Sequence, residues 1–262
     1  MVTVLKLGGS VITHKDEPET VDEESLARAC DVIAAFLADG ESEPNGEHRQ
    51  LVLVHGGGSF GHHHAAEHGV TSTEGTGNAQ TLTAIHRAMG ELNDTVMDAL
   101  HDRGVPALPV RPLSMAHRDE NGLSFPAVQF EAMLSEGFVP VTHGDVVVHE
   151  STGGTVLSGD DIVVSLADAL GADRVGLCST VPGVLDESGA VVPAIDSYEE
   201  VAAILGESDS TDVTGGMAHK VRQLLDLDAP ASVFDIESLE RFLHDERAGT
   251  LVYATTGPSV DN

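Results

Sequence analysis

Two short β-branched runs in the first quarter of the chain each end in a glycine-rich loop. The first, from Val2 to Leu7, stops at Gly8-Gly9-Ser10, and the second, from Leu51 to Val54, stops at His55-Gly56-Gly57-Gly58. Apolar runs of this length, bounded by turn residues, are typical of buried strands. We therefore predict two buried strands, each followed by a loop whose backbone is accessible because its glycines have no side chains.

Between these runs the apolar positions follow a helical period. From Asp22 to Ala38 they recur at helical spacing, with Glu23 and Glu24 in the first turn, which favours a helix. A second long helix is predicted over 79–102, followed by a strand near 107–110. The segment 112–155 differs, because apolar runs at 139–142 and 146–148 flank a polar turn. That pattern predicts strands around a turn, in a lid or hairpin region.

The remaining elements continue the alternation of strands and helices. An apolar helix is predicted to run from the Ser158-Gly159-Asp160-Asp161 segment to Leu170. Further strands are predicted at 174–178, 233–236 and 250–252, and further helices at 216–227 and 237–244. Such alternation indicates a mostly parallel sheet with helices on both faces. We expect an α/β fold, a three-layer αβα sandwich, in one domain over 1–262, since there is no internal repeat or clear linker.

The charge of the chain excludes several classes of partner. Lys plus Arg number 13 and Asp plus Glu 43, a formal net charge of −30. Such a surface repels phosphate backbones and anionic lipid headgroups. Seven Phe, two Tyr and no Trp leave few platforms for stacking bases. We expect no nucleic acid and no membrane among the partners.

The distribution of the charges indicates the compartment. The acids are scattered along the chain, and ten arginines accompany only three lysines, which we interpret as halophilic adaptation to a salt-rich cytoplasm. Cys30 and Cys178 are too few for a disulfide framework and lack zinc-site spacing. With no basic leader before an apolar stretch and no apolar run of membrane-spanning length, the expected localisation is cytoplasmic.

All three lysines lie near glycine-rich segments. Lys6 ends the first predicted strand, just before Gly8-Gly9, and Lys15 follows closely. A lysine at the end of a buried strand is costly unless an anion pairs with it, and paired glycines let backbone N–H groups approach that anion. A phosphate fits this arrangement, although an ordinary turn explains one Lys-Gly-Gly equally well.

The second glycine loop, 56–61, has the spacing G-x-G-x-x-G but not the context of a dinucleotide fold. The segment after it, 69–77, is polar and turn-like, and His62-His63 stands where a Walker A motif needs Lys-Ser/Thr. What remains is a glycine-rich anion nest that ends in His62. Consecutive histidines on a helix diverge, so the 62–64 run is a poor metal site, and we expect His63 and His64 at the surface.

Two further clusters carry candidate chemistry. Gly144-Asp145 and the 158–161 segment place carboxylates at turns; one of Asp160 and Asp161 is expected to cap the following helix, and the other to orient a lysine or organise Mg²⁺ around phosphates. At 214–216, Thr-Gly-Gly opens a helix whose first turn carries Lys220, a typical anion site. Phosphoryl transfer is therefore the leading hypothesis.

Together these motifs resemble the amino acid kinase superfamily, in order and over nearly the whole chain. Within it, Thr13-x-Lys15 and the loop Gly-Gly-Gly-Ser-Phe-Gly-His at 56–62 resemble the archaeal isopentenyl phosphate kinases. The resemblance implies the amino acid kinase fold, with an acceptor-binding part over about 1–170 and a nucleotide-binding part over about 171–262. It also implies a homodimer that uses Mg²⁺ and ATP to convert isopentenyl phosphate to isopentenyl diphosphate, in isoprenoid biosynthesis.

The resemblance also implies roles for individual residues. The catalytic residues are then Lys6, Lys15, His62 and Asp160. Acceptor binding is implied for Gly56, Gly57, Gly61, His62, Gly144, Asp145, Ser158 and Gly159. ATP binding is implied for Lys6, Gly8, Gly9, Ser10, Gly57, Thr180, Gly183, Gly215, Gly216 and Lys220. No direct protein ligand for a metal is implied. We expect the apolar pocket for the prenyl chain to be formed by Ile85, Met89, Val128 and Phe130.

One segment departs from the superfamily pattern. Ser-Thr-Val-Pro-Gly-Val-Leu at 179–185 stands where Thr-Asp-Val-Asp-Gly-Val-Tyr commonly contacts the base and ribose, so the preference for ATP over GTP stays open. Alternatives are the same fold with N-acetylglutamate, glutamate or UMP as acceptor, and a non-catalytic nucleotide-binding sensor. A Rossmann dehydrogenase is a more distant alternative.

Overall fold

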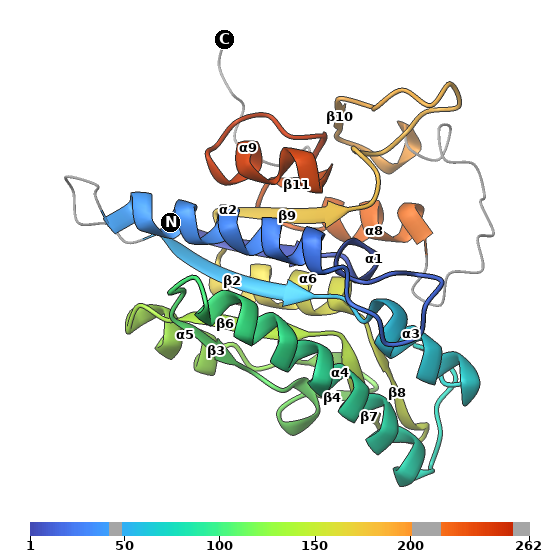
Figure 1. Cartoon of the computed structure of the whole chain (residues 1–262). Helices are drawn as coiled ribbons and strands as arrows, with labels where there is room; N and C mark the ends of the chain where they lie inside the picture. The colour runs from blue at the N-terminus through green and yellow to red at the C-terminus, as the bar shows by residue number, and fades with distance from the viewer. Residues whose placement is uncertain (42–48, 201–215, 254–262) are drawn as a thin grey trace.

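An eight-stranded sheet forms the centre of the protein in the computed structural model, which describes residues 1–41, 49–200 and 216–253 (Figure 1). Its strand order is β10-β12-β11-β9-β1-β2-β6-β3. The strands are β1 (Val2–Leu7), β2 (Gln50–His55), β3 (Ala107–Pro109), β6 (Val139–His143), β9 (Arg174–Ser179), β10 (Ala194–Ile195), β11 (Ala231–Asp235) and β12 (Thr250–Val252). The mixed α/β fold with a large, mostly parallel sheet confirms the predicted fold class.

The sheet is parallel except where β11 pairs with β12. β1 lies between β2 and β9, with Leu7 opposite His55 on one side and Cys178 on the other. His55 in turn is opposite His143 at the end of β6. Because parallel strands end at the same edge of a sheet, the glycine loops that follow β1, β2 and β6 lie side by side.

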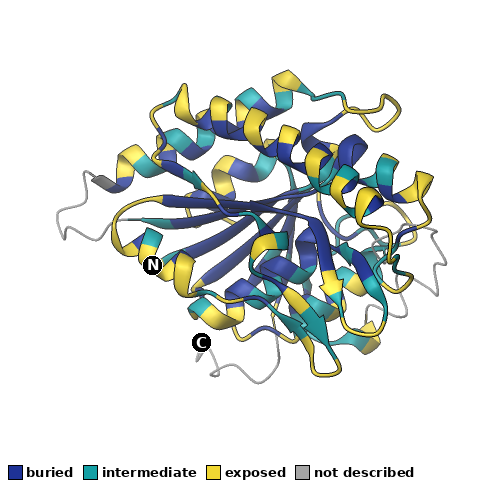
Figure 2. Cartoon of the chain, turned by 90° about the horizontal axis from the view of Figure 1, so that it is seen from below, coloured by how far each residue is buried: buried dark blue, intermediate teal, exposed yellow. Residues whose placement is uncertain are grey.

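Helices cover both faces of this sheet. One core joins it to α1 (Gly9–Ile12), α2 (Glu23–Glu41), α3 (Gly58–Glu67), α4 (Ala79–His101) and α9 (Leu239–Leu243). The other core joins it to α5 (Val128–Ser135), α6 (Gly159–Leu170) and α8 (Gly216–Leu225). Figure 2 shows the buried sheet between helices that expose only their outer sides. This is the three-layer arrangement expected from the alternating pattern.

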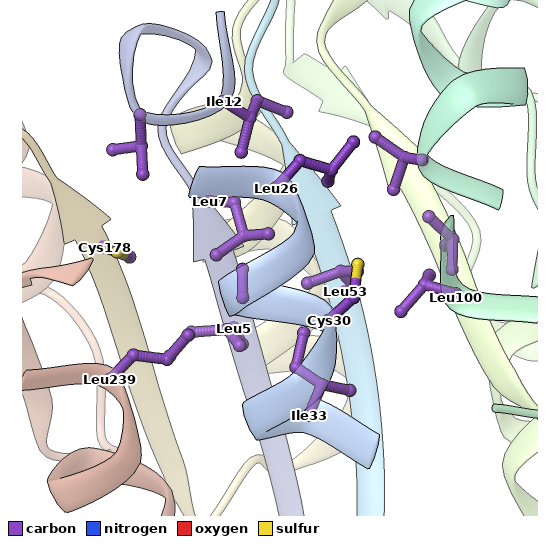
Figure 3. Packing of buried hydrophobic residues seen from close by; sticks show 14 of the residues in the cluster. Leu5, Leu7, Ile12, Leu26, Cys30, Ile33, Leu53, Leu100, Cys178 and Leu239 are labelled. Atoms are coloured by element: carbon purple, nitrogen blue, oxygen red, sulfur yellow. The ribbon is translucent and has the colours of Figure 1, made fainter. Parts of the chain in front are cut away.

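The amphipathic period of α2 explains its place on the sheet. Leu26, Cys30 and Ile33 recur at the spacing of one helix face, and all three are buried. Figure 3 shows them packed against leucines of β1 and β2. Burying an aliphatic side chain of this size contributes about 1.5–3 kcal/mol relative to its exposure. This face of α2 therefore stabilises β1, the strand that leads into the first glycine loop.

A second, four-stranded sheet is formed by the segment for which we predicted a hairpin or lid. Its strands are β4 (His117–Asp119), β5 (Gly122–Ser124), β7 (Asp145–His149) and β8 (Gly153–Leu157), in the order β5-β4-β7-β8. The predicted strands on each side of the turn are present, but they do not form a hairpin with each other. β6 belongs to the central sheet, and β7 pairs antiparallel with β8. The turn at 143–145 therefore carries the chain from one sheet to the other.

The predicted helices agree with the structure apart from their ends and one cap. Residues 237–244 form a 3₁₀ turn (Ile236–Ser238) followed by α9, and another 3₁₀ turn spans Pro112–Ser114. We expected Asp160 or Asp161 to cap α6, but Ser158 is the cap, because its Oγ accepts from the Asp161 N–H at 3.0 Å. The Asp160 carboxylate is left available for other partners.

Candidate active site

A cavity of about 430 Å³ opens where β1, β2, β6 and β9 end. Ligands of open parallel sheets bind at this edge. Of the residues named from the sequence, those that line it are Lys6, Gly8, Gly9, Ser10, Lys15, Gly56, Gly57, Gly61, His62, Ile85, Met89, Gly144, Asp145, Ser158, Gly159, Asp160, Thr180, Gly216 and Lys220. Segments from both ends of the chain therefore meet at one place.

Three of the named residues are not part of this lining, and a fourth cannot be placed relative to it. Gly183 packs elsewhere: a Cβ there would lie 2.6 Å from Thr250 Oγ1. Gly215 lies outside the described residues. The two residues expected from α5 do not reach the cavity, so that part of the predicted prenyl pocket is wrong: Val128 is 69% exposed, and Phe130 is buried in the core beneath the other face of the sheet.

The first two glycine loops touch each other, which explains why glycine stands at the points of contact. A Cβ on Gly9 would lie 2.0 Å from the backbone N of Gly58, a distance that no real side chain can take. Gly58 itself has φ +48°, a conformation that favours glycine. Thr13 joins the loops, because its Oγ1 donates to Gly9 O at 2.9 Å and accepts from the Ser59 N–H at 3.0 Å.

Three helices of ten or more residues begin at glycines that line the cavity. α3 begins at Gly58, α6 at Gly159 and α8 at Gly216, and all three glycines line the cavity. The N-terminus of a helix carries unpaired N–H groups and a partial positive charge, which favour bound anions. The cavity is therefore suited to anions although the whole chain carries a net charge of −30.

Two of the three lysines converge on one carboxylate inside the cavity. Lys6 Nζ lies 2.6 Å from Asp160 Oδ1, and Lys220 Nζ lies 3.9 Å from Asp160 Oδ2. Burial alone would raise the pKa of Asp160, but the nearby positive charges of Lys6 and Lys220 outweigh it and lower the pKa below its usual range. Asp160 is therefore an anionic bridge between two cations. The absence of a side chain at Gly159 leaves room for the Lys6 side chain, because a Cβ at Gly159 would lie 3.0 Å from Lys6 Cε.

Lys15 and His62 face the same cavity from the loop after α1 and from the first turns of α3. Lys15 is exposed and His62 is half-buried. Of the histidines that follow, His63 is exposed and His64 contacts Glu19 Oε1 through Nε2 at 2.6 Å. Of the three consecutive histidines, His62 alone lines the cavity.

A histidine that the sequence did not single out pairs with the buried carboxylate of Asp145. His86 Nδ1 lies 2.8 Å from Asp145 Oδ2, and Asp145 Oδ1 accepts from the Val146 N–H. The hydrogen bond to Asp145 raises the pKa of His86. His86 lies on α4 next to Ile85, but its partner is 59 residues away, so no local signal could reveal the pair.

One side of the cavity is apolar. Its wall includes Ala65, Ile85, Met89, Val156 and Leu157. Ile85 and Ala65 also belong to a small core that joins α3 and α4 to the second sheet. Two of these residues, Ile85 and Met89, were named from the sequence, and Val156 and Leu157 come from β8 of the second sheet rather than from α5.

The opposite side is formed by the end of β9 and the start of α8, where Ser179, Thr180, Val181 and Met217 line the cavity. These come from the segment that departs from the superfamily pattern and from the helix that carries Lys220. They were missed, apart from Thr180, because Ser, Val and Met at such positions have no chemical signature.

The described residues contain no group of three or more His, Cys, Asp or Glu side chains that could hold a metal ion. Among them, too, no helix is long and apolar enough to cross a membrane.

Comparison with known proteins identifies the family. The model of the amino acid kinase family matches residues 1–227. The isopentenyl phosphate kinase of Haloferax volcanii is 60% identical over 252 residues, which cover 96% of this chain and 98% of that protein. An acetylglutamate kinase of Aeromonas salmonicida is 28% identical over 239 residues, covering 85% of this chain and 84% of that protein.

The fold agrees with the sequence comparison. An X-ray structure of isopentenyl phosphate kinase superposes with a TM-score of 0.79 at 27% identity and covers 96% of this chain and 100% of the other. The chain belongs to the amino acid kinase family and, within it, to the isopentenyl phosphate kinases.

Proposed function

We propose that this protein transfers the γ-phosphoryl group of ATP to isopentenyl phosphate, giving isopentenyl diphosphate and ADP for isoprenoid biosynthesis. The observation that carries the proposal is the Lys6–Asp160–Lys220 bridge, which lies in a cavity with glycine loops, helix N-termini and an apolar wall. Besides this bridge, the glycine loop that ends at His62 and the apolar side of the cavity suit an acceptor that has a phosphate at one end and a hydrocarbon chain at the other.

In this mechanism the enzyme forms no covalent intermediate. An oxygen of the acceptor phosphate is already a nucleophile; it attacks the γ-phosphorus, and the bond from that phosphorus to the bridging oxygen of ADP breaks. The protein brings two anions together and stabilises the charge that spreads over the transferred group. Lys6 and Lys15 act on that group, and Lys220 acts on the nucleotide phosphates. Asp160 orients Lys6 and Lys220 through the bridge.

His62 binds the acceptor phosphate in this proposal. It lines the cavity at the end of the second glycine loop, and Gly56, Gly57 and Gly61 leave the backbone there open to an anion. Gly144, Asp145, Ser158 and Gly159 complete the acceptor side. A histidine that donates a hydrogen bond suits a phosphate acceptor, and we expect it to disfavour the carboxylates of N-acetylglutamate and glutamate.

Mg²⁺ enters with ATP in this proposal. It favours one or two carboxylates together with phosphate oxygens. The one carboxylate between the lysines, Asp160, is already paired with both, so the phosphate oxygens of ATP are the fitting ligands. The ion supplies charge neutralisation at the nucleotide phosphates.

The setting of the enzyme follows from composition and family resemblance. We propose a halophilic, cytoplasmic homodimer with a single kinase domain, whose acceptor part spans about 1–170 and nucleotide part about 171–262. Support for the salt adaptation comes from the charge of −30 and the use of only three lysines. Equal resistance to unfolding in dilute buffer and in molar KCl would contradict the halophilic part.

The substrate is tested by measuring ADP release in molar KCl with Mg-ATP and, in parallel, isopentenyl phosphate, N-acetylglutamate, glutamate or UMP. We expect turnover with isopentenyl phosphate alone. Turnover with another acceptor only would contradict the substrate but leave the kinase fold in place. ATP binding without turnover of any acceptor would favour a nucleotide-binding sensor instead.

A further inference from the structure

Two buried histidines immediately precede glycines of the cavity wall, although neither histidine lines the cavity. His55 ends β2 and His143 ends β6, and the two residues are paired in register. Both are completely buried, and their ring centroids are 5.3 Å apart. Each is followed by a glycine that does line the cavity, Gly56 in one case and Gly144 in the other. The mechanism above uses neither histidine.

The hydrogen bonds of His55 fix its tautomer from both sides. Its Nδ1 lies 3.1 Å from Gly56 O, and a carbonyl oxygen only accepts, so Nδ1 carries the proton. Its Nε2 accepts from the side-chain amide of Asn93, on α4, at 3.1 Å. Burial lowers the pKa of His55 to about 4, so the ring is neutral at physiological pH. A neutral ring has one donor and one acceptor, and both are used.

His143 repeats half of this arrangement. Its Nδ1 donates to Gly144 O at 2.9 Å, and burial also lowers its pKa well below the usual range. Its Nε2 and the Oδ1 of Asn93 are buried with no hydrogen-bond partner in the described part of the chain. Burying polar groups without partners is unfavourable, whereas apolar side chains would fill the same space without that cost. A purely structural role therefore does not explain why imidazole and amide groups are found here.

The bond from His55 sets the orientation of the next peptide group. No cis peptide occurs in the described ranges, and in a trans peptide the C=O and the following N–H point in opposite directions. Because Gly56 O faces the His55 ring, the Gly57 N–H points away from that ring. Gly57 lines the cavity, and within the described segments its N–H donates to no backbone carbonyl. That N–H is therefore available to an anion.

We propose that His55, held as the Nδ1–H tautomer by Asn93, is a positioning residue that aims the Gly57 N–H at a phosphate of the reacting pair. The inference rests on the proposed function for the identity of that phosphate. It assigns roles to two buried side chains that touch neither substrate. Rotation of the Gly56–Gly57 peptide would turn the donor away and present a carbonyl oxygen, which repels an anion.

Three substitutions of His55 separate its two hydrogen bonds. The amide of His55→Asn places a donor near the position of Nδ1, whereas that of His55→Gln reaches toward the position of Nε2, and His55→Leu removes both. We expect His55→Asn to keep kcat within about threefold of the wild type. We expect His55→Gln and His55→Leu to lower kcat by up to about 10²-fold, the effect of a misplaced group at a reacting centre. Thermal unfolding of each variant shows whether it is folded.

A matched control comes from another histidine bonded to a backbone carbonyl. His101, at the end of α4, contacts Ala107 O through Nε2 at 3.0 Å and does not line the cavity. His101→Asn is expected to leave kcat unchanged. A folded His55→Leu protein with wild-type kcat would overturn the proposal, as would equal losses in the Asn and Leu variants.

A spectroscopic measurement tests the tautomer without any turnover. The ¹⁵N spectrum of histidine-labelled protein, with His55→Gln used to assign the signal, should show a protonated Nδ1 and an unprotonated Nε2 from pH 6 to 9. Loss of this pattern in Asn93→Leu would support the role of Asn93, and a protonated Nε2 in the wild type would refute it. Because these spectra need no acceptor, a wild type inactive with isopentenyl phosphate would contradict the proposed function while leaving this test of His55 decisive.

Discussion

Replacing Asp160 by Asn gives the sharpest test of how the site is organised. The substitution preserves shape and removes the charge that joins the two lysines. Lys6 Nζ is 2.6 Å from the carboxylate, and its side chain is only 10% exposed. Without the carboxylate, Lys6 is a buried cation with no anionic partner in the described regions, and it lies close to the second cation, Lys220.

The size of the effect follows from these distances. At 3.9 Å and an effective dielectric constant of about 20, the attraction between Lys220 and Asp160 is about 4 kcal/mol. Removing one partner of a buried pair costs about 3–5 kcal/mol of stability. For the reaction, losing the orientation of a charge stabiliser corresponds to a decrease in kcat of about 10²- to 10³-fold. We expect both effects in Asp160→Asn.

The neighbouring carboxylate supplies the control. Asp161 lies in the same first turn of α6, but it accepts from Arg118 at 3.2 Å and from Gln223 at 2.8 Å and does not line the cavity. Asp161→Asn therefore removes the same charge from the same helix; we expect it to cost about 1 kcal/mol of stability or less and to change kcat little. Urea unfolding and ADP release measure both variants. A folded Asp160→Asn enzyme with the kcat of Asp161→Asn would refute the reasoning.

Four further predictions concern other parts of the site. Lys15→Ala should lower kcat by about 10²- to 10³-fold in an ADP-release assay, and unchanged turnover would remove Lys15 from the mechanism. His62→Ala should raise the KM for the acceptor and lower the rate without changing Tm; normal kinetics would contradict a role at the acceptor phosphate. Gly9→Ala should abolish activity and lower Tm, because its Cβ would lie 2.0 Å from backbone of the facing loop, and a stable, active variant would show that the loops are not in contact. Because the pKa of His86 is raised in the folded protein, its pairing with Asp145 stabilises the fold below pH about 6.5, and this stabilisation is lost as the pH rises through the folded-state pKa. The difference in urea stability between wild type and His86→Gln should therefore shrink from pH 6 to 9. A constant difference would contradict the pairing.

Much of the fold and of the cavity lining could be predicted from the sequence because their signals are local. Strands that end in glycine loops, and lysines kept beside those loops in a chain with only three, are visible in short windows. Parallel strands then bring Gly8, Gly56 and Gly144 to one edge without further information.

The features that were missed depend on partners distant in the sequence. A run of apolar residues on each side of a turn looks the same whether the strands pair or separate, so the split of β6 and β7 between two sheets could not be seen. Phe130 and Val128 have the chemistry of a prenyl pocket, but the packing of α5 sends one into the core and the other to solvent. The contact of Asn93 with His55 joins residues 38 apart and likewise has no local signature.

The central claim is that this site moves a phosphoryl group from ATP onto a phosphate oxygen, and ³¹P NMR of the reaction tests it most directly. In molar KCl with Mg-ATP and isopentenyl phosphate, we predict that the single monoester resonance is replaced by two mutually coupled diphosphate resonances as ADP accumulates. Accumulation of ADP with inorganic phosphate while the monoester signal persists would contradict the claim, because the γ-phosphoryl group would then have been transferred to water.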